Sequence, residues 1–191
     1  MKTTHLSFMV FTLLLFVTSC GLNEKTYAEE VFEKVAVNAN KIPNGFKRHF
    51  TEMQAQLKNG SLVIVAPDNK VKHVTASEYV ATHYVKMFDK DINAIQNLRS
   101  NSETSPILKE ALQLFEYVDG IYKTDFPRIA KMIDDGNPAG DIDAAIEQLD
   151  TEKGPVVDEK FNRVHDLIMP YADKHGVAYK TIEMPQPIKY K

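Results

Sequence analysis

The chain contains one cysteine, Cys20, and this feature narrows the folds available to it most strongly. An internal disulfide needs two thiols, so no disulfide can stabilise the folded chain. A hydrophobic core must supply the stability instead, and 191 residues are enough to bury one. Ten phenylalanines and eight tyrosines provide large apolar side chains for such a core.

Cys20 also ends an apolar segment close to the amino terminus. Lys2 supplies a positive charge, and residues 6–17 carry no charged side chain. A membrane-spanning helix needs about 20 apolar residues, so this shorter segment predicts a secretory signal peptide. The sequence Val17-Thr18-Ser19-Cys20 resembles the lipobox of bacterial lipoproteins.

The resemblance implies that the Cys20 thiol receives a diacylglyceryl group and that cleavage leaves Cys20 as an acylated amino terminus, with chains such as palmitate. The alternative is an ordinary signal peptide that happens to contain a cysteine. Lipidation predicts a partner, the membrane itself, and a location on the bacterial cell envelope, at the outer membrane or the cell surface. The expected organisation is a signal peptide (1–19), a lipidated tether (20–25), a helical domain (26–177) and a tail (178–191).

Apolar positions recur at helical spacing through most of the domain. They predict helical segments over 26–57 (interrupted at 43–45), 75–98, 105–133 and 141–175. Capping boxes are expected at Thr26–Glu29 and Thr75–Glu78, and caps at Ser105 and Asp141. Pro127 predicts a kink, and Gly154-Pro155 predicts a kink or a one-turn interruption.

Two other segments favour extended structure. Residues 62–66 and 71–74 are rich in β-branched side chains and flank a turn sequence, so they predict a small β-hairpin at 62–74. Residues 177–182 have a similar composition and are a candidate to pair with it. The fold class expected is mainly all-α, a kinked long-helix bundle of about four helices with this hairpin.

The body also resembles uncharacterised all-helical envelope lipoproteins over residues 26–177. The resemblance rests on residues 111–117, Ala-Leu-Gln-Leu-Phe-Glu-Tyr, and on Phe161 with residues 171–177, Tyr-Ala-Asp-Lys-His-Gly-Val. It implies a long-helix bundle and supplies no active site.

Motifs for chemistry are sparse. His49 and Glu52 form one isolated Glu/His pair without the second copy that a helical metal site needs, and no metal or cofactor is expected. No nucleophile elbow or glycine-rich phosphate loop occurs in the sequence. A net charge of −3 gives no basic face for nucleic acid. His49 and His83 are expected at exposed or flanking positions.

Asp91 is the polar residue that fits its helix least well. It falls between Met87 and Ile95 on the inward stripe, where a lone carboxylate is costly to bury. His83 lies two turns earlier on a similar side. Asp91 is expected to sit at the edge of the stripe, to pair with a tyrosine or an arginine, or to line a ligand cavity together with His83.

Two functions follow. The first is a lipid-anchored, non-catalytic module that binds another envelope component. The alternative is a carrier for a small ligand in a cavity between the helices near Asp91. A continuous, filled interior favours the binding module, and an apolar cavity with convergent polar groups favours the carrier.

Overall fold

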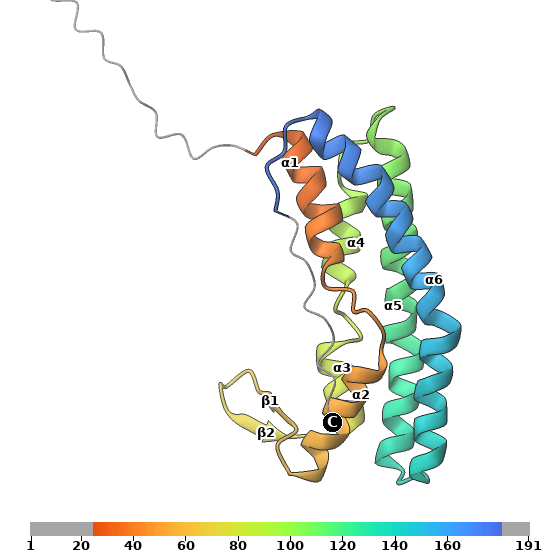
Figure 1. Ribbon diagram of the computed structural model, residues 1–191. Coiled ribbons are helices and arrows are strands. Elements are labelled where there is room, and N and C mark those ends of the chain that lie inside the picture. The colour runs from red at the N-terminus through yellow and green to blue at the C-terminus, as the bar shows by residue number, and fades with distance from the viewer. Residues whose placement is uncertain (1–24, 181–191) are drawn as a thin grey trace, which may run out of the picture.

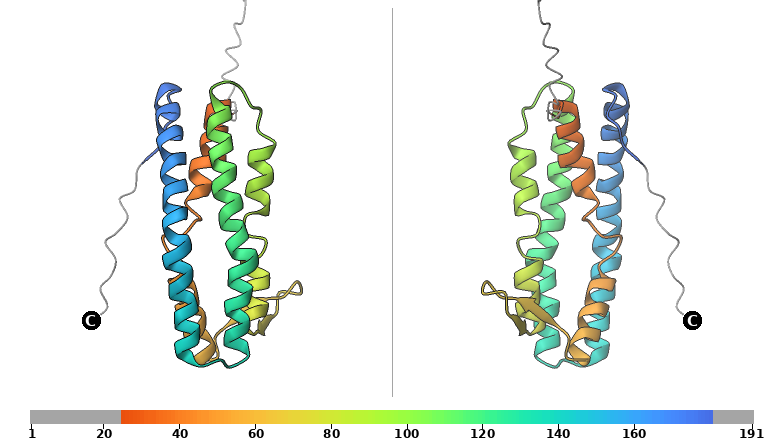
Figure 2. Two further views of the ribbon diagram at one scale, coloured as in Figure 1. Left: turned by 90° about the vertical axis from the view of Figure 1, so that its right-hand side faces the viewer. Right: turned by 90° about the vertical axis from the view of Figure 1, so that its left-hand side faces the viewer.

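The structure is a computed structural model that describes residues 25–180, so Cys20 and the predicted signal peptide lie outside the described residues (Figure 1). The two longest helices run side by side along the molecule, and the shorter elements pack along them (Figure 2). In chain order the elements are α1 (Tyr27–Phe32), the π-helix η1 (Glu33–Val37), α2 (Lys47–Lys58), β1 (Val63–Val65), β2 (Val71–His73), α3 (Ala76–His83), α4 (Asp89–Gln96), α5 (Thr104–Asp134) and α6 (Ala139–Lys174).

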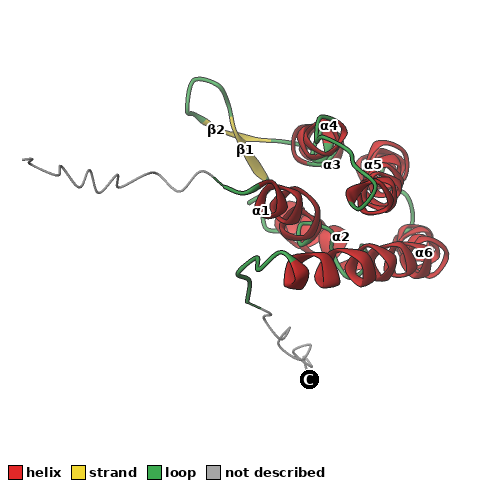
Figure 3. Ribbon diagram, turned by 90° about the horizontal axis from the view of Figure 1, so that it is seen from above, coloured by secondary structure: helices red, strands yellow, loops and turns green. Residues whose placement is uncertain are grey.

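The elements form a bundle whose two ends differ. Helix α5 contacts α3, α4 and α6, and α6 also contacts α1, η1 and α2. At one end α1 begins beside the start of α5 and the end of α6, and at the other lie α2, α3 and the hairpin (Figure 1). Viewed along the bundle, the hairpin extends outside the ring of helices (Figure 3). The predicted fold class, mainly all-α with a small hairpin at 62–74, is confirmed.

One hydrophobic core joins all the helices. Its largest fully buried side chains are mostly aromatic: Tyr122, Phe46, Phe50, Phe88, Phe115 and Phe126. Burying an apolar side chain of this size stabilises a fold by about 1.5–3 kcal/mol. These rings come from α2 with its preceding residue, from α5 and from the turn before α4, so the core fixes the short helices against the long pair.

Both predicted capping boxes are present. The Glu29 amide donates to Thr26 Oγ1 at 3.2 Å, and the Glu29 carboxylate accepts from the Thr26 amide at 2.7 Å. The same reciprocal pair joins Thr75 and Glu78 at the start of α3. Each satisfies amides that have no partner within the first turn of a helix.

Other helix starts depart from the prediction. Helix α5 begins at Thr104, and the Asn101 side chain rather than Ser105 accepts from the amides of Glu103 and Thr104, each at 2.9 Å. Helix α6 begins at Ala139, with no side-chain cap from Asp141. The Asn101 cap was missed because Ser105-Pro106 matches the usual starting pattern more closely.

The predicted helix over 75–98 is two helices. A turn at residues 84–88 separates α3 from α4. It brings the Tyr84 ring to 5.4 Å and the Phe88 ring to 5.5 Å from that of Tyr122, measured between centroids. Phe88 is fully buried and Tyr84 is half-buried, and packing of both rings against Tyr122 favours the break in a segment whose apolar spacing is otherwise regular.

The predicted interruption at Gly154-Pro155 is wrong, because α6 continues through both residues. Helix α5 likewise continues through Pro127. Pro155 removes the amide partner of the Thr151 carbonyl, and Thr151 is exposed, so water can satisfy that carbonyl. Pro127 likewise removes the amide partner of the Lys123 carbonyl, and Lys123 is exposed as well.

The hairpin has the predicted position and turn. Val63, Ile64 and Val65 of β1 pair antiparallel with His73, Lys72 and Val71 of β2. Asn69 in the turn has φ +60°, a left-handed conformation that asparagine tolerates. The sheet has only these strands among residues 25–180. Pairing of residues 177–182 with it is therefore not observed at 177–180, which are irregular, and 181–182 lie outside the described residues.

Candidate functional site

Asp91 lies in the first turn of α4, is only 6% exposed, and forms an ion pair. Lys41 Nζ lies 2.8 Å from Asp91 Oδ1 and 2.9 Å from Oδ2. Lys41 belongs to the loop between η1 and α2, so the pair ties the amino-terminal segment to α4. The expected tyrosine or arginine partner is wrong, because a lysine distant in the sequence takes that place.

His83 lies at the end of α3 and is exposed. Its ring stacks on the Tyr79 ring at 4.2 Å between centroids, and its Nδ1 lies 3.2 Å from the Tyr79 carbonyl oxygen. Asp91 and His83 therefore have separate partners, and the structure does not bring them together as one site.

Two hollows lie on the surface of the part of the chain that the structure describes. One, of about 370 Å³, is lined by residues of α2 and α6: Lys47, Thr51, Asp143, Ala144, Ile146 and Glu147. The other, of about 280 Å³, lies between α5 and Lys153 of α6. Neither hollow includes His83 or Asp91 in its lining.

A polar cluster, formed by the half-buried His49 and Tyr84 and the fully buried Tyr122, lies within the aromatic core. His49 Nδ1 is 3.1 Å from the Tyr84 hydroxyl, and the His49 ring packs edge-on against the rings of Tyr84, Tyr122 and Phe126. Of the expectation that His49 is exposed or flanking, the exposed position is wrong, because His49 is half-buried beside Phe50 on α2. The available signal was its position three residues after Phe46, on the side of α2 that carries the apolar stripe.

The cluster contains two polar atoms with no hydrogen-bond partner among the described residues. These are His49 Nε2 and the Tyr122 hydroxyl. Tyr122 is fully buried. Burial lowers the pKa of His49, with smaller effects from Glu52, Arg48 and Asp150, so the neutral imidazole is favoured.

The same environment keeps the two tyrosines protonated. Burial raises the pKa of Tyr84 to about 12, and it raises the pKa of Tyr122 even further. The cluster is therefore uncharged at neutral pH. Its three side chains form one hydrogen bond with one another, between His49 on α2 and Tyr84 at the carboxyl end of α3.

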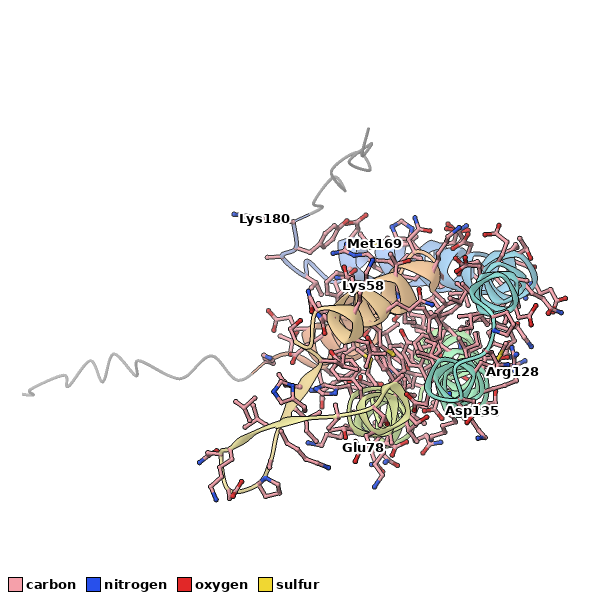
Figure 4. All side chains as sticks on the ribbon, turned by 90° about the horizontal axis from the view of Figure 1, so that it is seen from below. Lys58, Glu78, Arg128, Asp135, Met169 and Lys180 are labelled. Atoms are coloured by element: carbon pink, nitrogen blue, oxygen red, sulfur yellow. The ribbon has the colours of Figure 1, made fainter. Side chains whose placement is uncertain are left out.

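The hairpin is the most exposed apolar feature described. Val65 and Val71 face each other across the strands and are 68% and 66% exposed. From below, the hairpin side chains stand apart from the crowded interior (Figure 4). Sequence reasoning located the hairpin and missed this exposure, since alternation alone does not show which face is covered.

Residues 25–180 contain no group of three or more histidine, cysteine, aspartate or glutamate side chains placed to hold a metal ion. Within the same residues, no helix combines the length and apolar character needed to cross a membrane.

Comparisons with protein families, with curated proteins and with solved structures find no match for this chain.

Proposed function

We propose that this protein is a lipid-anchored component of a bacterial cell envelope that binds another envelope component without catalysing a reaction. The observation that carries the proposal is the continuous core. Buried side chains from α1 to α6 form one cluster, and the surface hollows between α2 and α6 and between α5 and α6 are lined by neither Asp91 nor His83. A filled interior favours a binding surface over an internal ligand chamber.

The position of the anchor gives the two ends of the bundle different environments. Thr26 caps α1, so residues 21–25 alone separate it from Cys20. Five extended residues reach about 18 Å at most. An acylated Cys20 therefore holds the α1 end near the bilayer and leaves α2, α3 and the hairpin at the far end, where an envelope partner has access.

The length of the bundle supports such a role. Helix α6 has 36 residues, which span about 54 Å at roughly 1.5 Å per residue. The Tyr27 hydroxyl donates to the Arg99 carbonyl, and Lys174 pairs with Glu103 at 2.7 Å, so the anchored end is cross-linked between its elements. The anchor is thus connected to a stiff body rather than to a free helix.

The alternative, a carrier with a cavity near Asp91, requires the Lys41–Asp91 pair to open. Asp91 accepts Lys41 through both carboxylate oxygens. A ligand at this place must replace those contacts, and we therefore favour the binding module.

The anchor is tested by substituting Cys20 with alanine. We expect the Cys20→Ala protein to leave the membrane fraction and to lose incorporation of labelled palmitate. Val37→Ala, at an exposed position of η1 that leaves residues 17–20 unchanged, is the control for expression. A Cys20→Ala protein that remains membrane-bound and labelled contradicts the proposed anchor.

The binding role is tested by photo-crosslinking in cells with the native anchor. The photoreactive residue is placed at Val71 in the hairpin or at Asp158, which is exposed on α6. We expect a reproducible adduct with another envelope protein at specific surface positions, and its identification by mass spectrometry. A scan of exposed positions on every element that yields no reproducible adduct contradicts the proposed function.

A further inference from the structure

The hydrogen-bond register of the hairpin shows which backbone groups point away from it. The Val74 amide donates to the Leu62 carbonyl, and the Ala66 amide donates to the Lys70 carbonyl. Hydrogen-bonded and non-hydrogen-bonded pairs alternate along an antiparallel ladder. The pairs Val63–His73 and Val65–Val71 are therefore the non-hydrogen-bonded ones, and their amides and carbonyls point to the outer edges.

The two faces of the hairpin differ as well. Leu62 and Val74 are buried, and they share a face with Ile64, which packs on the core. The opposite face presents Val65 and Val71 to solvent. The hairpin thus attaches to the bundle by one face and exposes an apolar cross-strand pair on the other.

The outer edges also differ in charge. The β2 strand reads Val-Lys-His, and its Lys72 forms an ion pair with Glu78 at 2.9 Å. Lysine on an edge strand opposes pairing with another chain. The β1 strand reads Val-Ile-Val and has no charge on its edge.

The β1 edge is complementary to itself. If two β1 strands pair antiparallel around Ile64, Val63 of each copy lies opposite Val65 of the other. These are the residues whose amides and carbonyls point outward, so they exchange backbone hydrogen bonds in both directions. A similar pairing of β2 places Lys72 opposite Lys72, which is unfavourable.

We propose that β1 binds β1 of a second copy of this chain, in antiparallel register around Ile64, so that the two hairpins form one continuous sheet. The exposed valines of the two copies then lie side by side on one face. Strands of three residues supply few hydrogen bonds, so the association is weak and depends on the high local concentration that a shared membrane anchor gives, and in this respect it rests on the proposed function. This inference concerns self-association and does not rest on the identity of any other partner.

Disulfide crosslinking in cells tests the register. In the proposed pair the two Ile64 residues are non-hydrogen-bonded neighbours with Cα atoms about 4.5 Å apart, within disulfide range. The two Val65 residues are about 8–9 Å apart, outside that range. We expect Ile64→Cys to form a disulfide-linked dimer, and Val65→Cys and Val71→Cys to form at least about ten-fold less, although both side chains are the more exposed.

The unsubstituted chain, whose one cysteine is Cys20, gives the baseline. Maleimide labelling and a thermal melt show that each variant is folded and that its thiol is reactive. Equal crosslinking at all three positions, or none at position 64 in a folded and reactive variant, overturns the proposal.

A proline variant tests the edge itself. Val65→Pro removes an outward amide and leaves the hairpin ladder intact, because Val65 donates no bond to β2. In the Ile64→Cys background we expect it to reduce the dimer at least about ten-fold. Val71→Pro removes the equivalent outward amide of β2 and is the matched control, which keeps the dimer. If both prolines have the same effect, the β1 edge is not the interface.

Discussion

His49 Nδ1 lies 3.1 Å from the Tyr84 hydroxyl, and this contact joins α2 to the end of α3. These two helices precede and follow the hairpin directly. The contact therefore ties the start of α2 to the end of α3, the helix ends away from the hairpin, and it depends on an imidazole held in an aromatic environment.

The first prediction concerns pH. The folded-state pKa of His49 is lowered by burial, so the unfolded chain binds its proton first as the pH falls below about 6.5. The contribution of the neutral His49 to the free energy of unfolding is fully present above that pH. It decreases as the pH falls towards the lowered folded-state pKa of His49. One proton can change the free energy of unfolding by at most about 1.4 kcal/mol per pH unit. The observed slope stays below this maximum, because His49 is only partly buried and solvent screens its charge.

Urea unfolding of the wild type and of His49→Gln between pH 8 and pH 5 measures this loss. Glutamine can hydrogen-bond Tyr84 and does not titrate in this range. We expect the stability of the wild type to fall more steeply with acid than that of His49→Gln. Parallel curves for the two proteins contradict the assigned role of His49.

The second prediction separates the two tyrosine hydroxyls. Tyr122 is buried with an unpartnered hydroxyl, so Tyr122→Phe removes a desolvated group and is expected to leave stability unchanged or to raise it by up to about 1 kcal/mol. Tyr84→Phe removes the partner of His49 Nδ1 and is expected to cost about 1 kcal/mol. Thermal melts of the two single variants at pH 8 test this difference in sign. A large loss in Tyr122→Phe means that its hydroxyl has a partner.

The fold class and the hairpin could be predicted because both depend on local patterns. Helical apolar spacing and the two capping boxes are short-range signals, and Thr26 and Thr75 cap as predicted. The turn between the strands is also encoded locally, by Pro67-Asp68-Asn69-Lys70.

What could not be predicted depends on distant partners. Lys41 pairs with Asp91, which is 50 residues away in the sequence, and His49 contacts Tyr84, which is 35 residues away in the sequence. The break between α3 and α4 likewise follows from a ring on α5. Periodicity assigns a residue to a face, and the polar partner across that face is fixed only by tertiary packing.

The third prediction is an asymmetry in the Lys41–Asp91 pair. Lys41→Met leaves a carboxylate unpaired whose side chain is only 8% exposed, while Asp91→Asn leaves an ammonium on a side chain that is 45% exposed. We expect Lys41→Met to cost about 1–3 kcal/mol and Asp91→Asn to cost less. Lys47→Met, which breaks an exposed pair with Glu147, is the control and is expected to cost under about 1 kcal/mol. Denaturant midpoints in the opposite order contradict a structural role for the pair.

The fourth prediction concerns a cap supplied from another helix. The Asp150 carboxylate on α6 accepts from the Phe46 amide at 2.5 Å and from the Lys47 amide at 3.0 Å, at the start of α2. Asp150→Ala leaves both amides without this acceptor and is expected to cost about 1–2 kcal/mol. Because the lost contacts hold α2 to α6, hydrogen exchange should accelerate within α2 and stay unchanged in α5.

Glu147→Ala is the matched control, because Glu147 lies one turn earlier on α6 and contacts Lys47 only through an exposed ion pair. It should leave exchange in α2 at the wild-type rate. Asp150→Asn keeps one oxygen that can accept, so it should fall between wild type and Asp150→Ala. Uniform acceleration over all helices in Asp150→Ala would show a global loss of stability in place of a local release of α2, and would remove Asp150 as the specific link between α6 and the start of α2.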